Sequence, residues 1–128
     1  MTDSRKKVGS PRAAPRGKPR TKLPGTAVRG SRTGRPIMAA FDLLGQRWTL
    51  RILWELRQGP IGFRALRDAA DALSPTLLNS RLKDLAQARL VSGGHDGYAL
   101  TLLGRKLLEA LAPLHDWAKS WQDALEPE

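Results

Sequence analysis

The residues best suited to chemistry in this chain are polar side chains that recur in the segment after Leu73. On a helical wheel they lie opposite or beside a stripe of leucines, as on an ordinary surface helix. Asn and Ser can hydrogen-bond to base edges, and Lys can meet a guanine or a phosphate. A solvated helix face explains the same pattern equally well when the segment is considered alone. The candidate DNA-contacting residues are Ser74, Thr76, Asn79, Ser80 and Lys83.

Four arginines are candidates for contacts with phosphate. Arg47 lies at the expected start of a helix, where exposed backbone amides favour an anion. Arg64 and Arg67 belong to the helix that precedes the leucine-striped segment. Arg81 lies nearer the leucine stripe, so its alternative is pairing with Asp84 or with an acidic residue of a neighbouring helix. An ordinary surface arginine is the alternative for the other three.

The charge of the chain is concentrated near its N-terminus. The formal net charge is +10, and residues 1–36 hold eleven of the 22 basic residues and one of the 12 acidic ones. Residues 37–128 are therefore formally neutral. The first segment has no aromatic residue and is interleaved with Pro, Gly, Ser and Thr, so we expect a disordered arm. A basic arm of this kind attracts polyanions, nucleic acid first among them.

Short strings in the arm resemble motifs that enter the minor groove. Residues 15–20, Pro-Arg-Gly-Lys-Pro-Arg, are similar to an AT-hook core with Lys in place of its second Arg, and residues 32–36 match more loosely. Non-specific attraction to phosphate is the alternative. Met38 is the only methionine besides Met1, so translation from Met38, which would produce the protein without the arm, is a further alternative. The candidate contacts of the arm are Arg16, Lys18, Arg20, Arg32 and Arg35.

Enzymatic chemistry is not expected. The chain has no cysteine, which excludes disulfides and thiol-based metal or redox sensing. His95 and His115 fall on a turn and on a terminal helix, and no nucleophile or metal-ligand set converges on either. We expect no metal and no cofactor.

The sequence also indicates where the protein is located. The N-terminus lacks the apolar core of a signal peptide, and no run of apolar residues is long enough to span a membrane, so we expect a cytoplasmic, nucleoid-associated protein.

Several amphipathic helices and one hairpin must position these side chains. Ser74-Pro75 is a helix start signal, because serine caps exposed amides and proline at the first position lacks the N–H that would go unpaired. Gly and Asp in residues 93–97 suit a hairpin turn, and Pro113 should break or kink the helix that follows. The fold class is mainly α with a small β-hairpin. The expected helices cover about 41–44, 48–56, 63–73, 75–88, 102–112 and 114–125, with strands at about 90–91 and 98–101.

The ordered series of motifs resembles the HxlR-type family of winged helix-turn-helix transcriptional regulators, over about residues 38–122. This resemblance implies a winged helix-turn-helix with C-terminal dimerisation helices, in which the helix at about 75–88 enters the major groove of double-stranded DNA. The matching stretches are Leu43–Leu50, Gly59–Leu66, Leu73–Leu85, Tyr98–Gly104 and Trp117-Ala118.

The chain departs from the family pattern in three ways. Many members carry a cysteine just ahead of the first helix, and some use it to sense oxidants or electrophiles. Residues 36–40 of this chain read Pro-Ile-Met-Ala-Ala, so the resemblance does not imply thiol sensing here. The wing is reduced to residues 92–98, which weakens the expectation of minor-groove contacts by the wing. The basic extension of 36 residues is not part of the pattern.

Apolar residues of the first and last helices indicate a homodimer. A winged helix this small cannot bury both helices within one subunit, and the resemblance implies the same arrangement. A pocket for a small-molecule effector between these helices stays open. The candidate interface residues are Phe41, Leu44, Leu114, Trp117 and Trp121.

Three functions from different classes are compatible with the sequence. The first is a sequence-specific transcriptional regulator that binds DNA as a homodimer, with the arm adding non-specific or minor-groove affinity. The second is an architectural, nucleoid-associated protein in which the arm dominates binding, with a steep salt dependence and weak sequence preference. The third is a winged helix used for protein contacts, which would ignore DNA. Residues 1–36 are the arm and 37–128 the folded domain in each case.

Overall fold

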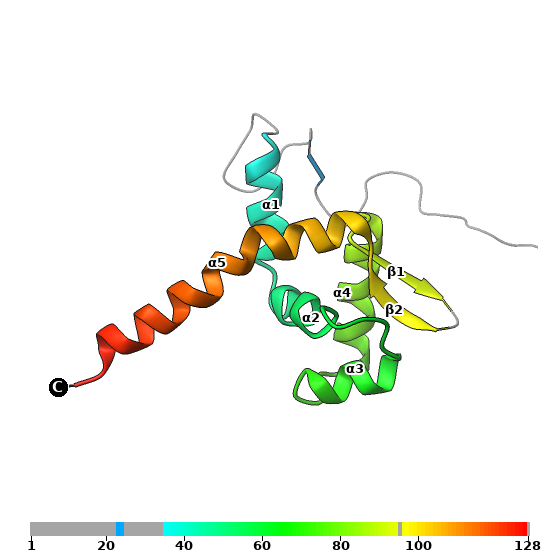
Figure 1. Cartoon of the computed structure of the whole chain (residues 1–128). Helices are drawn as coiled ribbons and strands as arrows, with labels where there is room; N and C mark the ends of the chain where they lie inside the picture. The colour runs from blue at the N-terminus through cyan, green and yellow to red at the C-terminus, as the bar shows by residue number, and fades with distance from the viewer. Residues whose placement is uncertain (1–22, 25–34, 95, 128) are drawn as a thin grey trace, which may run out of the picture.

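The computed structural model describes residues 23–24, 35–94 and 96–127. These residues form five helices and a two-stranded antiparallel hairpin, which is the winged helix-turn-helix arrangement expected from the sequence (Figure 1). The elements are α1 (Pro36–Leu44), α2 (Thr49–Glu55), α3 (Phe63–Ala69), α4 (Pro75–Gln87), β1 (Val91–Gly94), β2 (Gly97–Leu100) and α5 (Leu102–Leu125).

The core lies where α2, α3 and α4 meet, and β1 and β2 close it. The apolar positions of these helices point to one centre, as their helical spacing predicts. α4 supplies its leucine stripe at 78, 82 and 85, while Thr49 and Asp84 are the buried polar residues among those described. The largest fully buried apolar side chains are Ile52, Leu53, Leu56, Leu66, Leu78 and Leu85.

The turn between α3 and α4 sets the angle at which α4 leaves the domain. α3 ends at Ala69, not near Leu73 as expected, because Asp71 and Ala72 both adopt left-handed conformations with φ of 60° and 57°. The Arg67 guanidinium holds this turn by donating from Nε to the carbonyl of Leu73 over 2.8 Å. Two successive left-handed residues cannot continue a right-handed helix, so the turn is sharp.

The hairpin is fastened to the segment before α3. The backbone groups of Ile61 and Tyr98 exchange two hydrogen bonds of 3.0 and 2.8 Å, which form an isolated antiparallel bridge to β2. Gly97 makes the approach possible, because it has a φ of 104° and a Cβ there would lie 2.5 Å from the carbonyl oxygen of Ile61.

α5 is one continuous helix from Leu102 to Leu125, which corrects the expectation of two helices separated at Pro113. A proline inside a helix loses one hydrogen bond and crowds the carbonyl four residues earlier, here that of Glu109. Residues 112–127 are exposed along this helix, so water can satisfy the carbonyl that proline leaves unpaired. The C-terminal half of α5 extends away from the rest of the domain (Figure 1).

Candidate nucleic-acid interface

α4 presents one buried face and one polar face. Ser74 caps the helix as expected, since its Oγ accepts from the Leu77 amide over 3.1 Å, and Pro75 is the first helical residue. Thr76, Asn79 and Lys83 are exposed on the side away from the leucines. Their spacing of three and four residues places them in one row along the helix.

Ser80 differs from the other candidates on α4. Its side chain is partly buried and already interacts within the fold. The polar row that remains accessible to a partner is therefore Thr76, Asn79 and Lys83, with Ser74 exposed at the start of the helix. A threonine methyl and hydroxyl, an amide and an ammonium form a set that can read base edges in the major groove.

Arg81 and Arg47 are joined to each other within the fold. Arg81 donates from Nε to the carbonyl of Arg47 over 2.7 Å, and its Nη1 lies 3.9 Å from Asp84 Oδ2. The Arg81 side chain is only 18% exposed, so the geometry favours the internal pairing named as its alternative. α2 begins at Thr49, after Trp48 with a φ of 75°, so the expectation that Arg47 starts this helix is wrong. Arg47 is exposed in the turn between α1 and α2.

Arg64 and Arg67 also have different environments. Arg64 is exposed on α3, and its guanidinium is accessible to a phosphate. Arg67 is partly covered and holds the α3–α4 turn through Leu73. Of the candidate cations of the folded domain, Arg47, Arg64 and Lys83 are thus the exposed ones.

Arg51 was missed by the sequence analysis, although it organises the same region. Its Nε pairs with Glu55 at 2.8 Å, its Nη1 with Asp71 at 3.0 Å, and its Nη2 donates to the carbonyl of Ala69 at 2.8 Å. The hydrogen bonds that Arg51 donates to Glu55 and, secondarily, to Asp71 raise the pKa of its guanidinium. These contacts connect α2 to the α3–α4 turn. Only the spacing of four residues to Glu55 could have indicated part of this cluster.

The remaining site candidates fall into two groups. Arg35 is the N-cap residue of α1, whereas Arg16, Lys18, Arg20, Arg32 and His95 lie outside the described residues. His115 stacks on Trp54 with ring centroids 5.8 Å apart.

Within residues 23–24, 35–94 and 96–127, no three potential metal-ligating side chains lie close together. None of the helices in these residues is long and apolar enough to cross a membrane.

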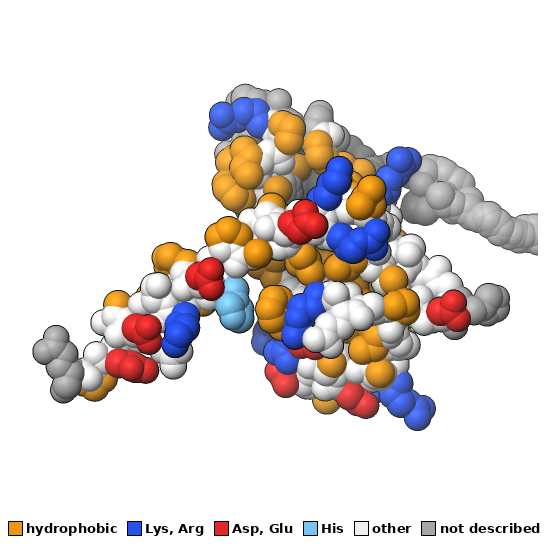
Figure 2. All heavy atoms as spheres, viewed as in Figure 1, with side chains coloured by type: hydrophobic (Ala, Val, Ile, Leu, Met, Phe, Trp, Pro, Cys, Tyr) orange, Lys and Arg blue, Asp and Glu red, His pale blue; other side chains and the backbone are white. Residues whose placement is uncertain are grey.

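The candidate dimer residues lie on the apolar surface of α1 and α5. Phe41 is 61% exposed, and Trp117 and Trp121 are 56% and 55% exposed while stacking on each other at 5.3 Å. Leu114 is also exposed, whereas Leu44 packs partly against the core. Apolar side chains gather over α1 and along α5 (Figure 2). Patches of this kind mark contact surfaces in small domains.

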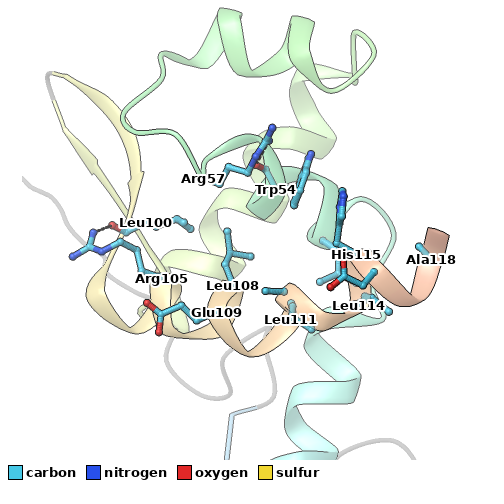
Figure 3. A pocket seen from close by; sticks show the side chains of 13 residues that line it. Trp54, Arg57, Leu100, Arg105, Leu108, Glu109, Leu111, Leu114, His115 and Ala118 are labelled. Carbon is cyan, nitrogen blue, oxygen red and sulfur yellow. Dashed lines mark hydrogen bonds between the residues drawn. The ribbon is translucent and has the colours of Figure 1, made fainter. Parts of the chain in front are cut away.

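A groove with a volume of about 840 Å³ runs between α2 and α5. Leu108, Leu111 and Leu114 line it from α5, and Trp54 and His115 stand side by side at one end (Figure 3). The Arg57 guanidinium lies 3.9 Å from the centroid of the Trp54 ring. The volume falls within the range of small-molecule sites.

A capped helix with an outward polar row, preceded by a sharp turn and followed by a hairpin, defines a DNA-binding protein of the winged helix-turn-helix class. Residues 43–126 match the model of the HxlR-like helix-turn-helix family. The chain belongs to this family and is a transcriptional regulator of the helix-turn-helix type.

Individual relatives agree with this assignment. An HTH-type transcriptional regulator of Methanocaldococcus jannaschii, MJ0925, is 28% identical over 95 residues, which cover 71% of this chain and 90% of that protein. The quinone-bound structure of YodB from Bacillus subtilis matches with a TM-score of 0.62 and 32% identity, covering 66% of this chain and 96% of YodB. A possible HxlR family transcriptional factor from Thermoplasma volcanium matches with a TM-score of 0.57 and 31% identity over 63% of this chain and 79% of its own. None of these comparisons points to an enzyme family.

Proposed function

We propose that this regulator binds a specific operator as a homodimer, with α4 in the major groove and the basic arm adding affinity. The observation that carries the proposal is the exposed row Thr76, Asn79 and Lys83, set on a helix whose opposite face is fully buried. A rigidly held helix can present these side chains to base edges with little loss of entropy. Arg47 and Arg64 would contact the phosphates on either side.

The exposed apolar residues of α1 and α5 support the homodimer. The C-terminal half of α5 is too exposed to be stabilised within one subunit, and Trp117 and Trp121 offer a large apolar area to a second copy. A two-fold dimer would place two copies of α4 about 34 Å apart, or one turn of DNA, and would select a palindromic site.

A non-covalent effector in the groove between α2 and α5 is a further part of the proposal. The YodB structure is described as quinone-bound, and quinones react readily with thiols. This chain has no cysteine, so a ligand here would have to bind through stacking and apolar contact. The groove offers apolar walls with Trp54 and His115 at one end, which suits a planar aromatic molecule.

The test is selection of bound fragments from a random DNA pool at about 150 mM salt, where arm-driven binding is partly screened. The full chain is compared with Asn79→Ala and with the matched control Lys119→Ala, an exposed change on α5. We expect one palindromic motif for the full chain and for the control, and a relaxed motif for Asn79→Ala. Enrichment of A·T-rich DNA without a motif, unchanged by Asn79→Ala, would instead favour an architectural protein driven by the arm.

A further inference from the structure

A second apolar groove, of about 340 Å³, lies between α1 and α5 and is lined in part by residues from the basic arm. Ala39, Ala40 and Leu43 line it from α1, and Leu103 and Leu107 line it from α5. Leu23 and Pro24 lie against the same groove although they precede α1 by more than ten residues. They are drawn beside α1 in Figure 1.

These two residues differ in character from the rest of the arm. Leu23 is the only leucine in residues 1–36, and it is partly buried and interacts within the fold. Pro24 follows directly, and its fixed φ lowers the entropy lost when the segment settles into one position. A leucine and a proline next to each other form a short apolar unit in an otherwise polar and basic sequence.

Both helices contribute apolar side chains to this groove, and Leu23 and Pro24 form part of its wall. α1 also packs against α2, and α5 packs against α2 and β2. The small side chains of Ala39 and Ala40 leave room on one wall. Leu103 lines the other wall and is 52% exposed with Leu23 and Pro24 in place.

We propose that Leu23 and Pro24 form a clasp that packs along the groove between α1 and α5 and anchors the basic arm to the folded domain. The arm is then held at two points, at Leu23-Pro24 and at Arg35. The anchor also fixes the point on the folded domain to which residues 1–22 are attached. These residues contain eight of the arm's eleven basic residues. The clasp rests on its own contacts and not on the proposed DNA specificity.

Tryptic cleavage of the full chain under native conditions tests the clasp, with each bond followed by mass spectrometry. The peptide bond between Lys22 and Leu23 lies at the proposed anchor. The bond between Lys7 and Val8 is far from the anchor along the same arm and serves as an internal reference. We expect Lys22-Leu23 to be cut at least about tenfold more slowly than Lys7-Val8, because cleavage needs local release of the anchor. Equal rates at the two bonds in the full chain would overturn the proposal.

Two variants make the result specific. Leu103→Ser alters the groove and leaves the cleaved sequence unchanged, so it should raise the rate at Lys22-Leu23 and not at Lys7-Val8. Leu23→Ser should do the same, with Val8→Ser as the matched control for serine after the cleaved bond. An unchanged rate in Leu103→Ser would contradict the clasp. Protection that appears only as protein concentration rises would also overturn it, because a second copy would then cover the groove.

Discussion

Asn79 and Lys83 stand on α4 without being needed for its packing, since both are exposed and the buried face belongs to leucines. Asn79→Ala or Lys83→Ala should therefore leave thermal stability nearly unchanged. Each should weaken binding to the selected site by about 1–3 kcal/mol and relax the choice of base at one position. Fluorescence anisotropy with matched and single-base-changed duplexes measures both effects. If either variant weakens all duplexes equally, that residue contacts phosphate and does not read bases.

Gly97 has a structural role at the same scale. Gly97→Ala would place a methyl group 2.5 Å from the Ile61 carbonyl at a φ of 104°, so we expect a loss of about 2 kcal/mol or more in the free energy of unfolding. Gly94→Ala is the matched control, because nothing lies within 4 Å of its Cβ position. Urea denaturation compares the two variants. Similar stabilities would mean that the wing can shift away from Ile61 at little cost.

At the scale of elements, α5 keeps a proline in its middle. Pro113→Ala would restore a backbone donor in the exposed half of the helix and remove the crowding at the Glu109 carbonyl. We expect greater protection of amides 110–117 in hydrogen exchange and an increase of up to about 3 kcal/mol in helix stability. Ala118→Gly, about two turns from the helix end, should act in the opposite direction by about 1 kcal/mol. No change in protection for Pro113→Ala would mean that this half of α5 opens independently of residue 113.

The α3–α4 unit also shows how elements depend on contacts between distant residues. Arg51 reaches Asp71 and the carbonyl of Ala69, and Arg67 reaches Leu73, so two arginines hold the turn that orients α4. The cost of the left-handed pair at Asp71 and Ala72 is offset by these contacts. The exposed polar row of α4 is thus oriented by residues that do not belong to it.

For the whole molecule, the proposed homodimer depends on the exposed apolar residues of α5. The double change Trp117→Ser, Trp121→Ser removes the largest exposed apolar area of α5 and should convert the proposed dimer to a monomer. Sedimentation velocity across a concentration series measures the shift, and Lys119→Ser between the two tryptophans is the control. The folded core should survive, because neither tryptophan belongs to it. A dimer that persists in the double variant would place the interface elsewhere.

Local signals in the sequence predicted much of the fold. The Ser74-Pro75 start of α4, its leucine stripe and the glycine-rich hairpin depend on neighbouring residues, so their patterns are visible without the tertiary structure. The row of Thr76, Asn79 and Lys83 follows from the same periodicity. The winged helix-turn-helix class and the family followed from the order of these motifs along the chain.

Only the tertiary structure decided which charged and apolar groups are engaged. Arg81, Arg67 and Arg51 look like ordinary surface arginines in sequence, and each is committed to a carbonyl or carboxylate brought near by folding. α5 continues through Pro113 where the helix is exposed to solvent. The helix propensity of a residue does not predict this exposure. Partners distant in sequence and access to water are properties of the folded chain. For this reason the periodic pattern determined α4 and its two faces, while the three-dimensional contacts decided which side chains remain available to a partner.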